Sequence, residues 1–314
     1  MSSHRTVDLA LMAVAFAWGS SYLATKGVVT QDDVFAFLVL RFAIAAVGLA
    51  IILAPRLRRA TRSELRLGML FGAVLSVVLV LETFGVTMTS ASNAGLIISL
   101  TIVMTPVLDR WIRRTALPPA FYGGAAIAVV GVGLLTQGNG LTTPGLGDGL
   151  ILLAAAARAV HVTVMARLSA GRVLDSARVT LIQLCTALVT FVVLTPFTGR
   201  GVADVAAHLD ARSWLLVLHL ALVCTVFAFL VQLWAVRRTS PSRVSLLLGT
   251  EPVWAAIIGV VVAADPVTLI GACGAACVLG GTNWGRVALR TGSRSTRRST
   301  SASASASASA SSIA

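Results

Sequence analysis

Hydrophobic residues occur along this chain in long blocks that short polar stretches separate. Ten blocks contain about 20 predominantly apolar residues, the length that an α-helix needs to cross about 30 Å of hydrocarbon. They cover residues 8–28, 34–54, 67–88, 92–112, 119–137, 148–168, 178–197, 214–236, 243–263 and 266–285. Because little chain is left between them, the pattern predicts an all-α integral membrane protein with ten transmembrane helices.

The first block follows two basic residues, as a secretory signal does. It is too long for a typical signal segment and carries Trp18 and Lys26, so we predict a helix that is retained. The last block is followed by residues 286–314, in which arginines lead into Ser-Ala repeats. A segment without bulky apolar residues cannot form a core, so the sequence predicts a disordered cytoplasmic tail.

Composition supports the membrane assignment, because 57% of the 314 residues are hydrophobic and only 12% are charged. The net charge of +13 would indicate a nucleic-acid partner in a soluble chain. Here 20 of the 25 basic residues fall outside the blocks or at their ends, in alternate connections on one side of the membrane, while Asp32, Asp33, Asp204 and Asp210 fall on the other side. This alternation follows the positive-inside rule, predicts that both ends are cytoplasmic and argues against nucleic-acid binding.

The two halves of the chain resemble one another. Residues 124–131 (GAAIAVVG) reappear as residues 274–281 (GAACVLGG), at an offset of 150, and Asp8 corresponds to Asp148 at an offset of 140. Five helices in each half give the halves opposite orientations, as in the inverted repeats of secondary transporters. We therefore predict a first repeat at 7–137 and a second at 147–285.

The chain carries short motifs at residues 16–22 (FAWGSSY), 40–42 (LRF), 89–95 (TSASNAG) and 251–256 (EPVWAA), together with the paired glycine segments. In combination these segments resemble the EamA family of the drug/metabolite transporter superfamily. The resemblance covers roughly residues 7–285. It implies ten helices in two EamA repeats, a bacterial cytoplasmic membrane, and export or exchange of small metabolites or drugs.

The chain departs from the family pattern in two places. Arg158, which corresponds to Trp18 at the offset of 140, stands where the second repeat commonly carries an aromatic residue. The usual glutamate after the ninth block is Asp265, and its counterpart in the first half is lost within residues 113–115. These departures are compatible with a specialised substrate or with drift.

Four charged residues lie well inside the apolar blocks, namely Arg41, Glu82, Arg158 and Glu251. Each unpaired charge near the bilayer centre would cost about 2.5–3.5 kcal/mol on insertion scales, so pairing is expected. A rise of about 1.5 Å per residue puts Arg41 and Glu82 at one level. Glu82 also corresponds to Gln232 at the offset of 150. A structural Arg41–Glu82 pair and a role in substrate or proton handling both remain open.

The first block carries a polar and aromatic helix face, and the sixth block carries its counterpart. The first face contains Trp18, Ser21 and Tyr22, and the second contains Arg158 and His161. These faces are candidates to line a central site, although packing of the aromatics and a backbone hydrogen bond from His161 would explain them too. Pro106 and Pro252 remove backbone donors in the fourth and ninth blocks, which predicts helix breaks near a midplane site.

We therefore predict a secondary transporter that moves small organic solutes by alternating access, with coupling to protons or to a counter-substrate. We predict no enzyme activity, cofactor or metal site, since no nucleotide-binding loop, metal-ligand cluster or nucleophile elbow occurs in the sequence. The alternatives are an integral-membrane enzyme acting on lipid and a scaffold or sensor that does not transport. The glycine-rich fifth and tenth blocks favour internal helix packing over a homodimer face.

Overall fold

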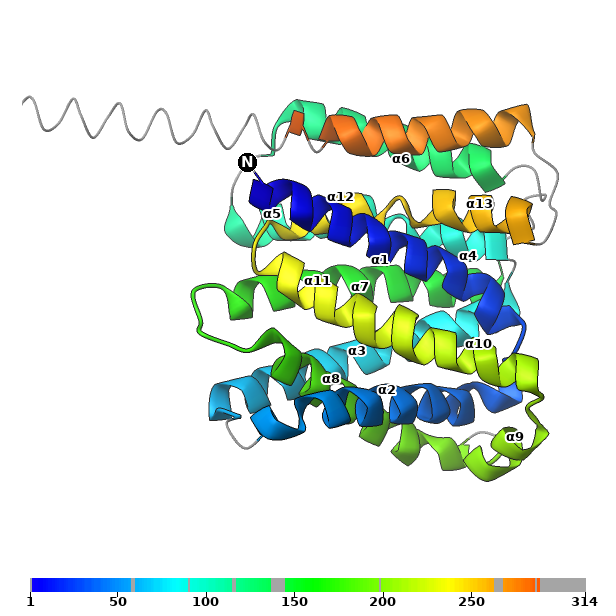
Figure 1. Cartoon of the computed structure of the whole chain (residues 1–314). Coiled ribbons are helices and arrows are strands. Elements are labelled where there is room, and N and C mark those ends of the chain that lie inside the picture. The colour runs from blue at the N-terminus through cyan, green and yellow to red at the C-terminus, as the bar shows by residue number, and fades with distance from the viewer. Residues whose placement is uncertain are drawn as a thin grey trace, which may run out of the picture.

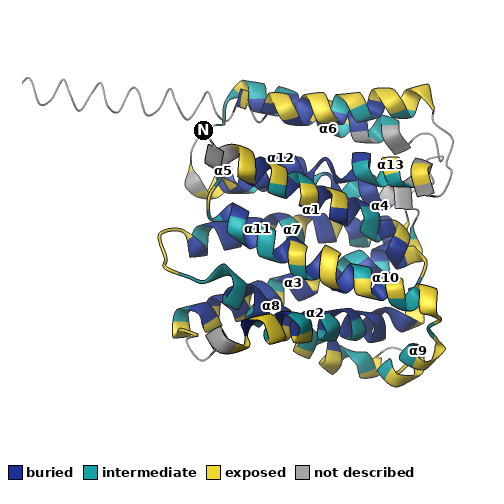
Figure 2. Ribbon diagram, in the orientation of Figure 1, coloured by how far each residue is buried: buried dark blue, intermediate teal, exposed yellow. Residues whose placement is uncertain are grey.

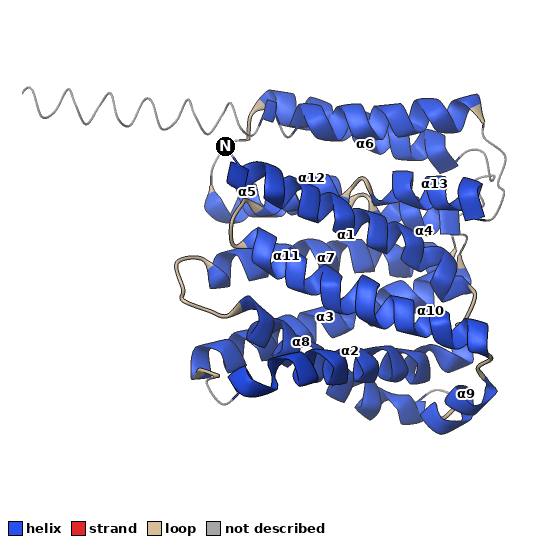
Figure 3. Cartoon of the chain, viewed as in Figure 1, coloured by secondary structure: helices blue, strands red, loops and turns tan. Residues whose placement is uncertain are grey.

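The chain folds into a bundle of helices that run side by side (Figure 1). The structure is a computed structural model that describes residues 2–57, 60–89, 91–114, 117–136, 145–197, 199–262, 268–285 and 287–288. Every regular element in these ranges is a helix (Figure 3). The predicted tail at 286–314 lies outside the described residues apart from 287 and 288.

The helices follow the apolar blocks of the sequence. Those of the first half are α1 (Ser2–Lys26), α2 (Val34–Leu57), α3 (Arg62–Met88), α4 (Ala91–Ile98), α5 (Thr101–Arg113) and α6 (Pro119–Thr136). Those of the second half are α7 (Leu146–Ser169), α8 (Ser176–Leu194), α9 (Val202–His208), α10 (Ala211–Ala221), α11 (Ala228–Val236), α12 (Pro241–Leu248), α13 (Glu251–Val262) and an unlabelled helix at 269–285. A π-helix at Leu222–Phe227 joins α10 to α11.

The fourth and ninth blocks are each divided into two shorter helices. The turn at 99–100 separates α4 from α5, and the turn at 249–250 separates α12 from α13, so the two breaks repeat the offset of 150. Pro252 lies in the first turn of α13, as the predicted break requires. Pro106 instead lies inside α5, so the prediction that it breaks the fourth helix is wrong in position. A proline in a short helix can be accommodated when its neighbours satisfy the freed carbonyl.

Within the described residues, six helices are long and apolar enough to cross a bilayer by length and composition alone. They lie at Arg5–Lys26, Gln31–Ala54, Arg62–Met88, Leu146–Ser169, Ser176–Phe197 and Ala211–Val236. The interrupted fourth and ninth blocks are too short as single helices to meet that length. The exact number of ten spans therefore stays a prediction, while an all-helical membrane bundle is established.

Contacts between the halves repeat in a two-fold pattern. Helix α3 packs on α7, and its counterpart α11 packs on α1; α2 packs on its own counterpart α8. In α6, a Cβ on Gly124 would lie 2.6 Å from the Gly281 oxygen, and one on Gly131 would lie 2.7 Å from the Gly274 oxygen. Each end of one glycine segment thus meets the opposite end of its repeat copy. Two copies of one segment that pack antiparallel make crossed contacts of this kind. These glycines therefore serve packing between the two halves of the same chain.

The most buried residues follow the middle of the bundle (Figure 2). The main hydrophobic core includes Phe42 of α2, Phe71 of α3 and Phe191 of α8, all with no exposed surface. The rings of Phe42 and Phe191 meet edge to face with centroids 5.1 Å apart. Apolar side chains such as Ile51, Val193 and Leu269 are instead exposed on the outside. An apolar exterior around a packed interior suits a bundle that is surrounded by lipid.

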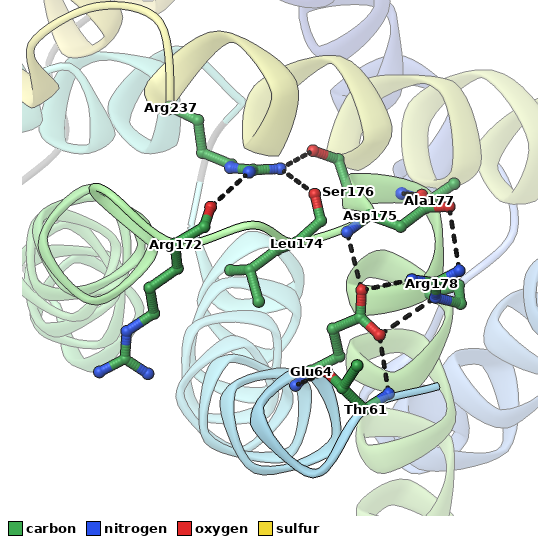
Figure 4. Close-up of polar contacts among 9 residues, drawn as sticks. All are labelled: Thr61, Glu64, Arg172, Leu174, Asp175, Ser176, Ala177, Arg178 and Arg237. Carbon is green, nitrogen blue, oxygen red and sulfur yellow. Dashed lines mark hydrogen bonds and ion pairs between the residues drawn. The ribbon is translucent and has the colours of Figure 1, made fainter. Parts of the chain in front are cut away.

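One end of the bundle is held by buried and half-buried ion pairs (Figure 4). Glu64, near the start of α3, accepts hydrogen bonds from Arg178 Nη2 at 2.7 Å and from the Asp175 backbone nitrogen at 2.8 Å. Arg237, just after α11, donates to the Leu174 oxygen at 2.7 Å. The connection between α7 and α8 is therefore fixed by the start of α3 and the end of α11. The same end holds α1's first turns, where Asp8 pairs with Arg243.

Candidate functional site

The buried charges of the bundle meet at Arg158 on α7. Its Nη2 atom lies 2.6 Å from Glu82 Oε2 of α3, and its Nη1 atom lies 3.2 Å from Glu251 Oε2, at the start of α13. Only 13% of the Arg158 side chain is exposed, against 14% for Glu82 and 4% for Glu251. Two carboxylates therefore share one guanidinium, and the three groups carry a net charge of −1 when all are ionised.

Arg41 does not take the place that the sequence suggested for it. The anticipated structural pair with Glu82 is wrong, because Arg158 occupies that position. Arg41, on α2, donates from Nε to the Thr225 hydroxyl at 2.8 Å and makes no salt bridge within the described residues. The depth of a residue along its helix can be estimated from sequence. The rotation of each helix about its own axis, which decides which side chains meet, cannot.

The aromatic residue Trp18 of α1 completes the site. The Arg158 guanidinium lies 4.9 Å from the centroid of the Trp18 ring, within cation–π range. The Trp18 indole donates to the Cys224 oxygen at 3.0 Å, which fixes the ring. Trp18 and Arg158 are equivalent positions under the offset of 140, and equivalent residues of a two-fold arrangement can touch only beside its axis. The contact therefore puts the site at the junction of the two halves.

Arg158 lines two cavities. The larger has a volume of about 40 Å³, room for a few water molecules. It is lined by Trp18, Ser21, Tyr22, Thr25, Arg41, Leu75, Val78, Leu79, Glu82, Thr83, Val86, Arg158, His161, Phe229 and Gln232. The smaller, of about 10 Å³, is lined by Ile98, Ser99, Thr101, Thr105, Arg158, Val162, Ser245, Leu248, Gly249, Glu251 and Pro252. A larger solute would need the helices to move apart.

The smaller cavity lies at both helix breaks. Ser99 and Gly249 lie in the two turns, and Thr101 and Glu251 begin the helices that follow them. Glu251 is the first residue of α13, where the positive end of the helix dipole favours a carboxylate. Discontinuous helices that place helix ends beside charged groups are typical of midplane binding sites in transporters.

Several buried polar atoms around the cavities have no partner within the described residues. They include Gln232 Oε1 beside the larger cavity and Thr105 Oγ1 beside the smaller one. A buried polar atom without a partner is costly unless water, an ion or a ligand satisfies it. Such atoms beside both cavities indicate a hydrated or ligand-binding interior.

The predicted site residues thus come together, with two qualifications. Trp18, Ser21, Tyr22, Arg41, Glu82, Arg158 and His161 line the larger cavity, and Glu251 lines the smaller one. The Ser21 hydroxyl donates to the Trp18 oxygen at 2.7 Å, so part of its hydrogen-bonding capacity is used within α1. Pro252 lines the smaller cavity, whereas Pro106 is absent from both linings.

Sequence reasoning missed the π-helix between α10 and α11. Its Thr225 hydroxyl donates to the Leu220 oxygen at 2.8 Å and accepts from Arg41. Nearby, the Ser20 hydroxyl lies 2.8 Å from His219 Nε2, and within the described part of the chain no carboxylate orients that imidazole as a catalytic triad requires. The apolar run at 214–236 gives no sign of an inserted residue, so composition could not reveal the π-helix.

These features define a polytopic membrane protein with an ionisable interior site at discontinuous helices, the architecture of a membrane transporter. The EamA-like transporter family matches residues 5–137 and again residues 145–284. The chain belongs to the EamA-like transporter family.

The similar proteins agree with this assignment. An uncharacterized transporter of Archaeoglobus fulgidus is 25% identical over 272 residues, covering 87% of this chain and 83% of the relative. The uncharacterized transporter YetK of Bacillus subtilis is 27% identical over 284 residues, covering 87% and 84%. A solved crystal structure matches with a TM-score of 0.71 at 18% identity, over 91% of this chain and 98% of the other, which shows the shared fold.

Proposed function

We propose that this membrane transporter is a secondary transporter of small organic solutes that exports or exchanges them by alternating access. In this proposal the bundle crosses the bacterial cytoplasmic membrane ten times, as inverted repeats at 7–137 and 147–285. The observation that carries the proposal is the position of Arg158, which binds Glu82 and Glu251 and lines both cavities. Ionisable groups inside a membrane bundle mark solute and ion pathways.

The two-fold contact pattern supports alternating access. Helices α3 and α7 of opposite halves pack together as α11 and α1 do, and Trp18 meets its counterpart Arg158 beside the axis. If the halves exchange their conformations, a pathway on one side of Arg158 closes as the equivalent pathway on the other side opens. The two small cavities that Arg158 lines suit such an exchange.

The charge balance supports coupling to protons or to a counter-solute. Glu82, Arg158 and Glu251 carry a net charge of −1, which one proton or one cationic group would neutralise. Burial of a neutral cluster in the low-dielectric interior costs less free energy than burial of a charged one. Binding of a proton to either carboxylate still leaves the other paired with Arg158, so the cluster has two states of similar architecture and different charge.

The ends of the bundle support the proposed orientation. Arg178, Arg237 and Arg243 gather at the end that holds the first turns of α1 (Figure 1). The opposite end carries Asp33 and Asp204, both in ion pairs with Arg200. Under the positive-inside rule the first end faces the cytoplasm.

The test measures transport by Glu82→Gln in liposomes that contain purified protein. Solutes are first found by thermal stabilisation of the wild-type protein across metabolite classes, and uptake of each is then followed at several pH values. We expect Glu82→Gln, which copies Gln232 of the other half, to fold normally and to lose most transport or its pH dependence. Asp204→Asn, an exposed carboxylate on α9, is the matched control.

A Glu82→Gln protein with the wild-type rate and pH profile would remove Glu82 from the mechanism. If liposomes with correctly folded protein transported no solute of any class, the proposed function itself would be overturned. The scaffold or sensor alternative would then stand.

A further inference from the structure

The smaller cavity lies where the two interrupted helices pack together. The Ser245 hydroxyl of α12 donates to the Thr101 oxygen of α5 at 2.6 Å. A Cβ on Gly249 would collide with the Ile102 side chain, so the two turns are in close contact. Thr101 corresponds to Glu251 at the offset of 150, and both residues line the cavity. The cavity is therefore built from equivalent breaks in the two halves.

Two hydroxyl groups of this cavity have already used their protons. Thr101 Oγ1 donates to the Ile98 oxygen at 2.8 Å, and Ser245 Oγ donates to the Thr101 oxygen. A hydroxyl group has one proton, so only lone pairs are left on these two oxygens for a ligand. Oxygen lone pairs bind a cation and repel an anion.

Thr105 of α5 adds a third hydroxyl group. Its side chain lines the cavity and is 0% exposed, and Oγ1 has no hydrogen-bond partner within the described chain. A buried hydroxyl without a partner is costly unless a bound group satisfies it. Thr105 is therefore the observation that most directly indicates a ligand in this cavity.

The break before α13 adds a backbone oxygen. Pro252 has no amide hydrogen, so it cannot make the helical hydrogen bond to the Leu248 oxygen. Leu248 is the last residue of α12 and lines the cavity. Carbonyl oxygens at the C-terminal ends of such half-helices coordinate sodium ions in secondary transporters.

Charge and size limit what this cavity can hold. Glu251 lines it and shares Arg158 with Glu82, so the three groups carry a net charge of −1 when ionised. One monovalent cation neutralises that charge, whereas Ca²⁺ and Mg²⁺ need more carboxylates or keep several waters. The volume of about 10 Å³ has room for about one water-sized group. A cation would therefore be bound without its hydration shell.

We propose that the smaller cavity binds one dehydrated sodium ion and that this ion couples transport. Its ligands are oxygens of Thr101, Thr105, Ser245, Leu248 and Glu251. The coupling role rests on the proposed transport function, whereas binding of the ion can be measured without transport. In the transport cycle the sodium ion takes the place of the proton that would neutralise the carboxylate cluster. A cavity of this size favours sodium over the larger potassium ion.

The first experiment measures thermal stability of the full-length purified protein in detergent. Sodium chloride, potassium chloride and choline chloride are compared at equal ionic strength, so that chloride and screening are the same. We expect sodium alone to raise the apparent melting temperature in a saturable manner, because an ion that binds only the folded state stabilises it. Equal stability in the three salts would overturn the inference, since a cavity that holds only water does not distinguish them.

Variants then assign the ion to the smaller cavity. Thr105→Val should weaken sodium binding by about 10- to 100-fold, the usual effect of losing one polar contact to a charged group. In choline chloride the same variant should be at least as stable as the wild type, because it removes a buried hydroxyl without a partner. Thr180→Val is the matched control, since its hydroxyl is equally buried without a partner in the described chain but lines neither cavity.

A wild-type sodium response in Thr105→Val would refute the site, as would an equal loss in Thr180→Val. If Thr105→Val cannot be purified, Ser245→Ala provides the same test, and an unchanged sodium response in that variant would refute the site too.

Liposomes separate the sodium site from the transport function. For a solute found by thermal stabilisation, transport should require sodium and should lose that requirement or its rate in Thr105→Val. Transport at equal rates in sodium chloride and choline chloride would overturn the inference and leave the proposed transport function intact. Stabilisation by sodium without transport of any solute would overturn the transport function, while the sodium site would remain.

Discussion

Replacement of Arg158 by methionine tests how the buried charges are held. Methionine is similar in length and apolar, so the change removes the guanidinium without opening a large cavity. In the native protein the N–O distances of 2.6 and 3.2 Å correspond to roughly 5–6 kcal/mol of Coulomb attraction each at an effective dielectric of about 20. Desolvation of the three groups offsets most of this attraction.

The variant leaves two carboxylates in one cavity without a cation between them. Breaking a buried ion pair from one side typically costs about 3–5 kcal/mol. For a chain of this size that is a fall of roughly 5–15 °C in the apparent melting temperature. The triple variant with Arg158→Met, Glu82→Gln and Glu251→Gln removes every charge and should regain most of the lost stability.

The assay heats purified protein in detergent and measures the fraction that remains folded and monodisperse at each temperature. Glu82→Gln alone should cost little, because Arg158 keeps a one-to-one pair with Glu251. The reasoning would be refuted by an Arg158→Met protein as stable as the wild type. It would also be refuted by a triple variant that is no more stable than the single one.

Two further predictions concern the bundle. In a protein without its native cysteines, Arg172→Cys should resist an impermeant maleimide added outside cells while Asp204→Cys reacts; labelling of Arg172→Cys would reverse the orientation. Gly124→Leu should lower the yield of folded protein, because its Cβ would lie 2.6 Å from the Gly281 oxygen. Gly133→Leu should be tolerated, because a Cβ added there would have no neighbouring atom within 4 Å. Equal yields for the two glycine variants would contradict the close packing of α6 on residues 269–285.

The fold class was predictable because lipid limits what a chain can do. Backbone groups in hydrocarbon must bond within the segment, so an apolar block of about 20 residues has few alternatives to a helix. Internal similarity at offsets of 140 and 150 also carried real structural information. It correctly relates the turn at 99–100 to the turn at 249–250 and Gly124 to Gly274, because each half packs its own copy of the same residues.

The partners of the charged residues were decided by tertiary structure. Sequence identified Arg41, Glu82, Arg158 and Glu251 as costly inside apolar blocks, and the reason is desolvation, which depends only on depth. Which cation meets which carboxylate depends on the rotation of each helix about its axis and on its neighbours. Those are set by side-chain packing across the whole bundle, so Glu82 pairs with Arg158 and not with Arg41.

Local backbone irregularity shows the same division. The π-helix at Leu222–Phe227 and the position of the break before Thr101 both depend on hydrogen bonds made to other segments. Thr225 reaches Arg41 on α2, and the Ser245 hydroxyl of α12 donates to the Thr101 oxygen at 2.6 Å. The amino-acid pattern alone predicts that the chain forms membrane helices in two related halves with charges inside. The positions of the helix breaks and the pairing of the charges depend on the folded bundle, because the competing arrangements differ by contacts between residues far apart in the chain.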